Sequence, residues 1–314
     1  MADALVVIQK VAKILWTIFL ALLYSLEGLI WALIPYKFLK HKDVGGEVVL
    51  ITGAGSGLGR MMALRFASLG STLVLWDVNK TGNDETLKQI EALGGQAYAY
   101  VCNCSDNEEV YKVAAQVKED VGDVTILINN AGVVAGKQLI DAPDNLIKRT
   151  MDVNVTAHFW TLKAFLPTML ARNHGHVVTI ASLAGHFGTK GLVEYCASKF
   201  GAVGIDESLR FEILENNKTG VKTTVICPYF INTGMFDGVV SKEPWILPIL
   251  EPEYVIDNIM EAVLTNTEMV VLPKTMWLLT YLKPILSSRA MLLLHKYSGM
   301  DCTMDDFKGR DKKD

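Results

Sequence analysis

The sequence of 314 residues predicts an α/β fold in which helices cover both faces of a doubly wound parallel sheet, and three observations support this class. Short apolar runs alternate with longer helical stretches from residue 48 to residue 227. A glycine-rich segment follows the first apolar run and leads into a helical stretch. The polar residues Asp77, Asn129 and Ser182 stand where later apolar runs end. Such alternation indicates a parallel sheet, because each return to the sheet needs a crossover connection.

The expected elements follow from the apolar periodicity and from the polar segments between them. The sequence shows no internal repeat and no low-complexity segment. Strands are expected at residues 48–52, 73–76, 97–102, 124–128, 176–181 and 222–227. Helices are expected at residues 61–69, 86–93, 107–121, 144–154, 156–172 and 194–216. Pro167 falls inside the fifth of these helices and is expected to kink it.

The composition argues against several classes of protein. The net charge of −4 gives no basis for binding nucleic acid. The five cysteines are odd in number and three adjoin apolar runs, which indicates reduced thiols rather than a disulfide framework. No second ligand pair follows Cys102 and Cys104, so no metal site is expected. The apolar share of 50% and the mean hydropathy of +0.26 are high for a soluble enzyme.

The N-terminal segment accounts for this hydropathy. Residues 14–34 carry no charge apart from Glu27 and are about long enough to cross a bilayer, which takes roughly 20 residues. A signal peptide would end in a cleavage site of small residues, and the sequence shows none here, so a signal peptide is not expected. The lysines of the flanks are Lys10 and Lys13 before the segment and Lys37, Lys40 and Lys42 after it. Their excess after the segment favours a cytosolic catalytic domain, and a spanning helix and a helix lying in one leaflet both fit the pattern.

The glycine-rich segment has the composition and the position of a dinucleotide-binding loop. Glycines let the backbone approach a pyrophosphate, and the start of the next helix supplies unpaired N–H groups. Asp77 ends the second strand, where a carboxylate accepts hydrogen bonds from ribose hydroxyls and repels a 2′-phosphate. NAD(H) is therefore favoured over NADP(H), although Arg60 is near. The residues assigned to the loop are Gly53, Ser56, Gly57, Leu58 and Gly59.

Tyr195 and Lys199 are four residues apart in an expected helix and so share one of its faces. A phenol titrates near ~10 in water, and a neighbouring ammonium is expected to draw its pKa toward the working range of a general base. Tyr36 and Lys40 have the same spacing, so the spacing alone is weak evidence. Ser182 and the glycine loop on the same chain distinguish the pair at Tyr195.

Five motifs stand in the order and spacing of the short-chain dehydrogenase/reductases, and the chain resembles that family. They are Thr52-Gly53 with Gly57 and Gly59, residues 129–132, Asn154, Ser182, and Tyr195 with Lys199. The resemblance covers roughly residues 46 to 273 and implies one Rossmann-type domain. Further segments, among them residues 164–167 and 233–236, are similar to the membrane-attached retinol dehydrogenase branch of the family.

The resemblance implies a catalytic role for four residues. Tyr195 would take the proton of the alcohol as general base, and Lys199 would lower its pKa and bind the nicotinamide ribose. Ser182 would hydrogen-bond the substrate oxygen, and Asn154 would hold a water that links Lys199 to solvent. These roles are physically consistent, because hydride leaves a carbinol carbon only as the O–H proton is removed. Ser182 lacks the Gly-x-Ser-x-Gly surroundings of a hydrolase nucleophile.

The resemblance also implies cofactor contacts beyond the glycine loop. Asn103 and Cys104 would border the adenine, although the family usually has Asp at the position of Asn103. Asn129 is expected to brace neighbouring strands, and His186 is a candidate to border the substrate. The other assigned contacts are Asn130, Ala131 and Gly132 on the floor of the cofactor site, and Ile231 and Thr233 beside the nicotinamide carboxamide.

Two apolar segments follow the last expected strand. Residues 231–250, with Met235 and Phe236 assigned to the substrate, suit a lid over an apolar ligand, and packing against the domain's own helices is the alternative. Residues 276–294 are interrupted by charges, which favours an amphipathic surface on the membrane over a second span. The mixed charges of residues 305–314 indicate a solvated tail. The predicted organisation is an anchor at 1–42, a catalytic domain at 43–275 and a C-terminal segment at 276–314.

The resemblance implies NAD-dependent oxidation of a lipophilic alcohol at a membrane, with all-trans-retinol first and a 17β-hydroxysteroid second. A weakly catalytic lipid-droplet scaffold is the alternative, but a scaffold needs none of the four catalytic residues. The branch implies the endoplasmic reticulum membrane, with lipid droplets as a further location. A homodimer is implied as well, because the helix that carries Tyr195 commonly forms the subunit interface in the family.

Overall fold

The computed structural model describes residues 2–309, and for residues 2–4, 31–33 and 37 it describes the backbone alone. The chain divides into two compact units, Met1–Lys42 and Asp43–Asp314. The first unit contains helix α1 (Ala2–Leu33) and the short 3-10 helix Tyr36–Phe38. Lys40 lies beyond that short helix, so Tyr36 and Lys40 do not share a helix face.

Helix α1 exposes apolar side chains along its length. Its segment Leu5–Ile30 has 26 residues and is long and apolar enough to cross a membrane, by length and composition. At about 1.5 Å per residue this segment is about 39 Å long, more than the roughly 30 Å of a hydrocarbon core. Trp16, Leu22 and Tyr24 are each at least 60% exposed, so the helix leaves them uncovered within its own unit.

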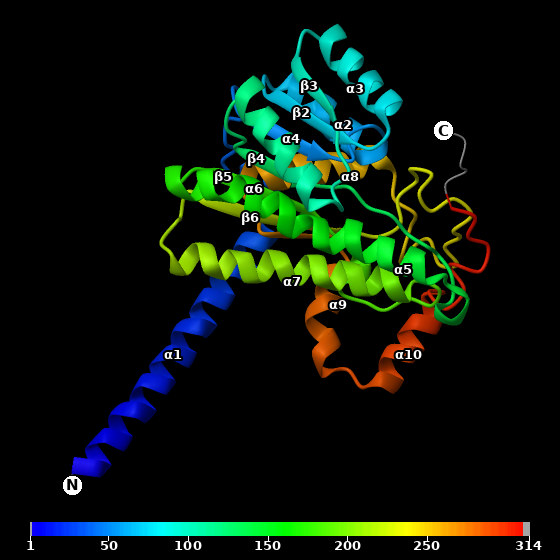
Figure 1. Ribbon diagram of the computed structural model, residues 1–314. Coiled ribbons are helices and arrows are strands. Elements are labelled where there is room, and N and C mark those ends of the chain that lie inside the picture. The colour runs from blue at the N-terminus through cyan, green and yellow to red at the C-terminus, as the bar shows by residue number, and fades with distance from the viewer. Residues whose placement is uncertain (1, 310–314) are drawn as a thin grey trace. The chain divides into compact units, whose positions relative to one another are not determined.

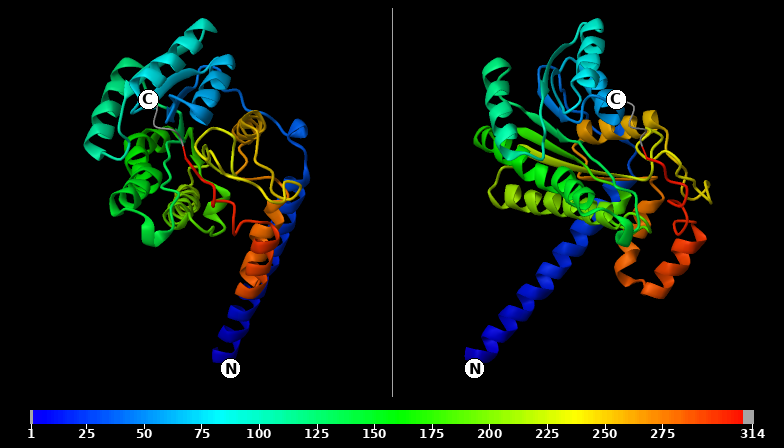
Figure 2. Two further views of the ribbon diagram at one scale, coloured as in Figure 1. Left: turned by 90° about the vertical axis from the view of Figure 1, so that its right-hand side faces the viewer. Right: turned by 45° about the vertical axis from the view of Figure 1, so that its right-hand side comes forward.

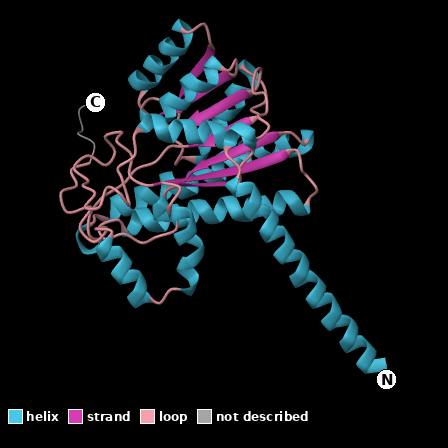
Figure 3. Cartoon of the chain, turned by 180° about the vertical axis from the view of Figure 1, so that it is seen from behind, coloured by secondary structure: helices cyan, strands magenta, loops and turns pink. Residues whose placement is uncertain are grey.

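The second unit is built on one sheet of seven parallel strands (Figure 1; Figure 3). The strands are β1 (Val48–Thr52), β2 (Thr72–Asp77), β3 (Gln96–Val101), β4 (Ile126–Asn129), β5 (Gly175–Ile180), β6 (Val221–Pro228) and β7 (Met269–Leu272). Their order is β3-β2-β1-β4-β5-β6-β7, so the winding direction reverses between β1 and β4. Ligands of such sheets bind at this reversal, outside the carboxyl ends of the strands. The predicted doubly wound parallel sheet is confirmed.

Helices cover both faces of the sheet (Figure 1; Figure 2). The helices of the second unit are α2 (Gly57–Ser68), α3 (Lys80–Ala92), α4 (Asn107–Asp120), α5 (Asp144–Met151), α6 (Ala157–Arg172), α7 (Val193–Glu215), α8 (Pro252–Thr265), α9 (Met276–Leu282) and α10 (Ser288–Tyr297). Helices α2, α3 and α8 pack on one face, and α4, α6 and the second half of α7 pack on the other. Each face of the sheet has its own hydrophobic core. Within β1, Val49 and Ile51 belong to the core under α2, α3 and α8, and Leu50 belongs to the core on the other face, since successive side chains point to opposite faces.

The strands and helices predicted between residues 48 and 227 are present, although several helices begin earlier than expected. The expected helices 144–154 and 156–172 are not separated by a break, because a π-helical stretch, Asp152–Thr156, joins α5 to α6. Helix α8 and strand β7 are absent from the sequence-based prediction. They add a helix to one face of the sheet and a strand to its edge.

The C-terminal part of the chain packs into the second unit. The expectation of a solvated tail from residue 305 onward is wrong for Phe307, which is half-buried and packs against the core. Lys190 also pairs with Asp305 at 2.9 Å. The physical reason is that Phe307 is the one apolar side chain in a charged run and finds an apolar partner elsewhere in the fold. Residues 310–314 of the predicted tail lie outside the described residues.

Candidate active site

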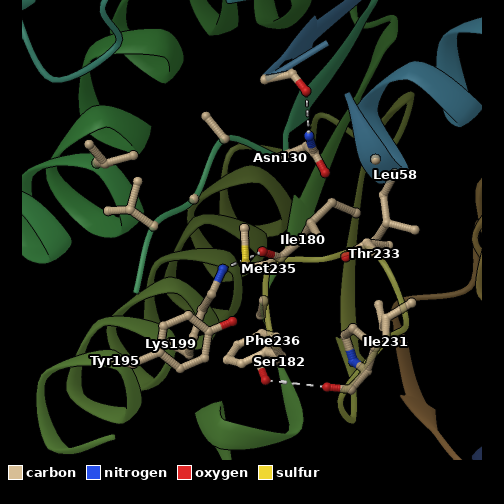
Figure 4. A pocket seen from close by; sticks show the side chains of 18 of the residues that line it. Leu58, Asn130, Ile180, Ser182, Tyr195, Lys199, Ile231, Thr233, Met235 and Phe236 are labelled. Atoms are coloured by element: carbon tan, nitrogen blue, oxygen red, sulfur yellow. Dashed lines mark hydrogen bonds between the residues drawn. The ribbon is translucent and has the colours of Figure 1, made fainter. Parts of the chain in front are cut away.

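A cavity of about 770 Å³ lies at the carboxyl ends of strands β1 to β6. One end is lined by the glycine loop and Asp77, and the other by Ser182, Tyr195 and Phe236 (Figure 4). A dinucleotide lying along the strand ends would therefore reach the expected catalytic side chains. The predicted site residues that line the cavity are Gly53, Ser56, Gly57, Leu58, Asp77, Asn103, Cys104, Asn130, Ala131, Gly132, Ser182, Tyr195, Lys199, Ile231, Thr233, Met235 and Phe236.

Three glycines of the loop, Gly53, Gly55 and Gly59, leave little or no room for a side chain. Gly53 has φ +67°, in the left-handed region that favours glycine. A Cβ on Gly59 would lie 2.0 Å from the carbonyl oxygen of Gly53, and one on Gly55 would lie 2.9 Å from a carboxylate oxygen of Asp77. Bare backbone thus faces the cavity at the start of α2, where the first N–H groups have no partner within the helix. This cradle fits an anionic pyrophosphate.

Asp77 is held by the backbone of the loop that it faces. Its Oδ2 accepts a hydrogen bond from the N–H of Gly55, and its Oδ1 accepts one from the N–H of Asn79, both at 2.8 Å. Each carboxylate oxygen keeps capacity for a further hydrogen bond from a ligand. The guanidinium of Arg60 donates to the carbonyls of Gly55 and Gly82 at 2.5 and 3.1 Å. Arg60 is therefore engaged with the backbone, and it does not line the cavity.

The asparagines after β3 and β4 differ in what they do. The side chain of Asn103 closes a local turn, because its Oδ1 accepts a hydrogen bond from the Ser105 hydroxyl at 2.7 Å. Asn130 donates from Nδ2 to the backbone of β1 at 2.9 Å. Asn129 does not line the cavity. It accepts a hydrogen bond from Thr161 on α6 at 2.8 Å, so it braces a helix rather than the neighbouring strands.

Tyr195 and Lys199 lie in the first turns of α7, and Ser182 follows β5 closely (Figure 4). Lys199 Nζ donates to the carbonyl of Ile180 at 2.8 Å and lies 5.6 Å from the centroid of the Tyr195 ring. The Ser182 hydroxyl donates to the carbonyl of Pro228 at 3.2 Å and accepts from the N–H of Ala184 at 3.1 Å. As a hydrogen-bonding group beside the phenol of Tyr195, it acts to lower the pKa of that phenol. The three side chains converge on one end of the cavity.

Burial dominates the titration of this group. Tyr195 is 5% exposed, and burial raises its pKa well above the ordinary value, although the hydrogen bond with Ser182 opposes the rise. Burial also lowers the pKa of Lys199 to about 8. In the protein without cofactor, the expectation that Lys199 draws the pKa of the phenol downward is therefore wrong, because burial has the larger effect. The spacing of the pair does not reveal that both side chains are buried.

Asn154 lies in the π-helical stretch, an irregularity that often marks functional sites. Its Oδ1 accepts a hydrogen bond from the N–H of Val133 at 2.8 Å. Its Nδ2 donates to the carbonyl of Val133 at 2.9 Å and to the hydroxyl of Ser198 at 3.0 Å. Asn154 thus ties the loop after β4 to α7 beside Lys199, and it does not itself line the cavity. Its water-holding role stays a prediction.

The end of the cavity that holds Tyr195 and Ser182 is apolar and aromatic. Phe236 packs edge-on against Tyr195, with ring centroids 5.6 Å apart, and it also packs on Phe230 at 4.8 Å. Farther along the same segment, Leu247 is buried in the core while Trp245 is 74% exposed. Residues 231–250 therefore both line the cavity and pack against the domain, so the two alternatives for this segment occur together.

Some cavity residues carry no motif, and sequence reasoning missed them. Thr189 and Leu192 line the cavity from the loop before α7, and their closeness to Tyr195 in the sequence is a signal that points to them. Met300 also lines the cavity, but it comes from the chain after α10 and has no local signal. The candidate His186 does not line the cavity, and its carbonyl accepts a hydrogen bond from the C-terminal part of the chain.

A glycine cradle at one end of the cavity and a Tyr–Lys–Ser group at the other define an alcohol oxidoreductase of the Rossmann type. The profile of the family described as short chain dehydrogenase matches residues 47–244, and the chain belongs to this family. The human protein named epidermal retinol dehydrogenase 2 is 51% identical over 289 residues, which cover 92% of this chain and 93% of that protein. Human retinol dehydrogenase 10 is 43% identical over an alignment of 329 residues, which covers 96% of this chain and 93% of that protein. The resemblance to the retinol dehydrogenase branch is confirmed.

Two solved structures have the same fold. A short chain dehydrogenase/reductase from Burkholderia phymatum, in complex with NAD, has a TM-score of 0.70 and is 28% identical, covering 78% of this chain and 95% of that chain. A metagenomic short-chain oxidoreductase, in complex with NADP, has a TM-score of 0.61 and is 26% identical. The match covers 73% of this chain and 97% of that chain. The two similar proteins thus bind different nicotinamide dinucleotides.

Proposed function

We propose that this protein oxidises a long apolar alcohol with NAD as hydride acceptor, and that all-trans-retinol, which yields all-trans-retinal, is its substrate. The observation that carries the proposal is the continuous cavity that joins the glycine cradle to Tyr195, Lys199 and Ser182. The aromatic and aliphatic lining beside Tyr195 favours an apolar ligand. The names of the two relatives, both retinol dehydrogenases, support a retinoid.

The proposed reaction consists of a proton transfer and a hydride transfer. An alcohol oxygen held by the Ser182 hydroxyl gives its proton to the phenolate oxygen of Tyr195, and the carbinol carbon loses a hydride. When bound, the oxidised nicotinamide supplies the hydride acceptor and a positive charge at this end of the cavity. Since burial raises the pKa of Tyr195, the phenolate depends on such a charge and on its hydrogen bond with Ser182.

The choice of NAD over NADP rests on the charge at the adenosine end. Asp77 lines the cavity there with both carboxylate oxygens directed by backbone amides. A carboxylate at this place accepts hydrogen bonds from ribose hydroxyls and repels a 2′-phosphate. Arg60 donates to two backbone carbonyls and does not line the cavity, so its guanidinium is not directed at a 2′-phosphate.

A 17β-hydroxysteroid is the second candidate substrate. The edge-on rings of Phe230, Phe236 and Tyr195 form a wall that suits a flat, rigid hydrocarbon as well as a polyene. Turnover of retinol and estradiol side by side, each with NAD and with NADP, separates the candidates. The larger kcat/KM identifies both the alcohol and the cofactor.

Attachment to a membrane is part of the proposal. Helix α1 is long and apolar enough to span a bilayer. In the second unit, Leu278, Ile285 and Leu293 on α9, α10 and the turn between them are between 59% and 79% exposed. An exposed apolar surface of this kind suits the interface of a bilayer that holds the substrate. We expect the endoplasmic reticulum membrane or a lipid droplet, with the catalytic unit on the cytosolic side.

We also propose that the protein forms a homodimer through α6 and α7. Phe159 on α6 is 47% exposed, and Phe211 and Leu214 on α7 are 61% and 51% exposed. Large apolar side chains on two helices of a folded unit are typical of an interface with a second copy. Sedimentation of the protein in detergent at several concentrations measures this association.

Tyr195→Phe tests the chemistry directly. The variant keeps the ring that packs on Phe236 but lacks the hydroxyl, so retinol turnover should fall by about 10²–10⁴-fold. NADH binding, followed by nicotinamide fluorescence, and recovery in the membrane fraction should stay unchanged. Tyr254→Phe, at a partly exposed tyrosine on α8, is the matched control and should keep full turnover. Retained turnover in Tyr195→Phe would refute the assignment of the base.

A further inference from the structure

Residues 299–308, here called the C-terminal strap, cross three loops that border the cavity. The N–H of Lys308 donates to the carbonyl of Asp237 at 2.9 Å, in the loop after β6. The ammonium of Lys190, in the loop before α7, pairs with Asp305 at 2.9 Å. Since an exposed ion pair contributes little to stability, the backbone contact and the packing of the strap carry more weight than this pair.

Three glycines, one in each loop, make room for the strap. A Cβ on Gly136, in the loop after β4, would lie 2.0 Å from the ring of Phe307, and one on Gly238 would lie 2.2 Å from the carbonyl oxygen of Asp306. A Cβ on Gly191 would lie 3.3 Å from the Cβ of a strap methionine. All three have positive φ, at +62°, +85° and +77° respectively. Three separate loops thus have glycine where the strap approaches them most closely.

Phe307 is connected to the reacting end of the cavity through Phe236. The centroids of these two rings are 6.2 Å apart, and Phe236 in turn meets the ring of Tyr195 at 5.6 Å with an interplanar angle of 81°. Figure 4 shows Phe236 close to Tyr195 and Ser182. Phe307 does not line the cavity, so it supports the ring that borders the phenol from behind.

The strap also supplies part of the cavity wall. Met300 lines the cavity and is 7% exposed. Thr303 is 2% exposed, and its hydroxyl donates to the carbonyl of Gly299 at 2.8 Å. Its side chain lies beside the phenol of Tyr229, another lining residue. Met300 and Met304 belong to the same buried cluster as Tyr195. Removal of the strap would open this end of the cavity to water.

We propose that the strap completes the alcohol-binding wall, and that Phe307 is a positioning residue that holds Phe236 against Tyr195 and so favours long apolar alcohols over short ones. The inference rests on the proposed alcohol oxidation, but not on the choice of retinol over a steroid. Apolar contact with the wall grows with the length of the substrate, so a loosened wall weakens the binding of a long alcohol most. At the far end of the cavity, none of the atoms that a Cβ on Gly53, Gly55 or Gly59 would meet belongs to the strap.

Phe307→Ala in the full chain, purified in detergent, is the first test. The KM of all-trans-retinol should rise about tenfold, the factor that corresponds to ~1.4 kcal/mol of lost binding. The inhibition constant of geraniol, an allylic alcohol with half as many carbons, should change by less than about threefold. The dissociation constant of NADH should be unchanged, and Phe307→Leu should restore most of the affinity for retinol.

Gly136→Ala approaches the same contact from the other side. An added Cβ displaces the Phe307 ring, so this variant should raise the retinol KM as Phe307→Ala does. The double variant should be no worse than Phe307→Ala alone, because the clash disappears with the ring. Gly94→Ala is the matched control: Gly94 has φ +77°, but a Cβ there would meet nothing within 4 Å. It carries the same backbone strain and should leave the KM unchanged.

The outcomes separate the strap from the proposed function. An unchanged retinol KM in Phe307→Ala, with only a lower midpoint of thermal unfolding, would show that the strap merely stabilises the fold and would overturn the inference. A KM that rises equally for retinol and NAD would overturn it as well. If the wild-type chain oxidises estradiol rather than retinol, the same variants are compared with estradiol. Absence of turnover with either alcohol refutes the proposed function, and retinol binding by fluorescence then tests the strap.

Discussion

At the scale of single residues, burial sets the charge state of the site more than pairing does. Tyr195 and Lys199 are each at most 5% exposed, and burial favours the neutral form of both. His158 on α6 is also buried, and burial, together with the charge of Lys199, lowers its pKa to about 3. At neutral pH the phenol and the imidazole are therefore uncharged, whereas Lys199 stays mostly protonated. A further positive charge bound beside the buried phenol has a large effect on its pKa.

Asp77→Asn should shift the cofactor preference toward NADP. The amide keeps an oxygen to accept from the N–H of Gly55 but loses the charge that repels a 2′-phosphate. The ratio of kcat/KM for NAD to that for NADP should fall by about tenfold or more. The control is Asp84→Asn, which removes a carboxylate on α3 that pairs with Lys80. An unchanged ratio in Asp77→Asn would show that selection of the cofactor lies elsewhere.

The buried imidazole of His158 predicts a loss of stability in acid. Its pKa of about 3 is below the unfolded value near ~6.5, so the unfolded chain binds more protons between these values. The contribution is complete above pH ~6.5 and is lost as the pH falls toward about 3. Burial raises the pKa of Asp206 to about 7, which acts in the opposite direction and is common to wild type and variant.

His158→Gln removes only the first of these two titrations. Between pH 6.5 and pH 5 the unfolding free energy of the wild type should fall by about 2 kcal/mol more than that of the variant. Urea unfolding of the full chain in detergent, followed by tryptophan fluorescence at both pH values, measures the difference. Equal pH dependence in the two proteins would mean that the imidazole is not buried neutral.

At the scale of elements, α9, α10 and the turn between them expose several large apolar side chains. Ile285, between the helices, is 79% exposed and Leu293 on α10 is 71% exposed. Arg289 and Lys296 are exposed on the same helix, which suits a negatively charged lipid surface. Sequence reasoning identifies this segment because the apolar run is long and interrupted by charges at short intervals.

The double variant Ile285→Glu and Leu293→Glu should weaken access of a membrane-borne alcohol. Two carboxylates at these positions oppose burial in an anionic interface. The KM of retinol presented in phosphatidylcholine–phosphatidylserine vesicles should rise several-fold, whereas the KM of retinol in detergent micelles should stay the same. Leu93→Glu, at a residue 64% exposed after α3, is the control. Equal kinetics in vesicles for all three proteins would contradict the membrane-facing surface.

At the scale of the whole molecule, the sequence predicts the parts that bear motifs and misses the parts that depend on distant partners. The glycine loop, Ser182 and the Tyr195–Lys199 pair are read from local spacing, because each needs particular residue types at fixed positions. Phe307 belongs to a charged run, and its partner Gly136 is in a loop far upstream, so no local pattern marks their contact. The raised pKa of Tyr195 is invisible for the same reason, since burial is a property of the folded chain.

The charges on either side of the apolar segment predict the orientation of the catalytic unit relative to a membrane, and glycosylation tests this prediction. More lysines follow the apolar segment of α1 than precede it, which favours the second unit on the cytosolic side. The unit carries two exposed acceptor sites, Asn79 and Asn217. Asn79 caps α3 through its Oδ1, which accepts from the N–H of Gly82 at 3.1 Å, so a glycan on Nδ2 would not disturb the cap. Neither site is therefore blocked by the fold.

The chain expressed in mammalian cells should accordingly show no change in mobility on treatment with peptide N-glycosidase. A shift that disappears in the double variant Asn79→Gln and Asn217→Gln would place the unit in the lumen and refute the cytosolic orientation. An N-terminal extension with one Asn-Gly-Thr acceptor then separates the two membrane geometries. The acceptor is modified if Leu5–Ile30 spans the bilayer, since the extension then lies in the lumen. It stays unmodified if the helix lies in the cytosolic leaflet, because both ends of the helix then face the cytosol.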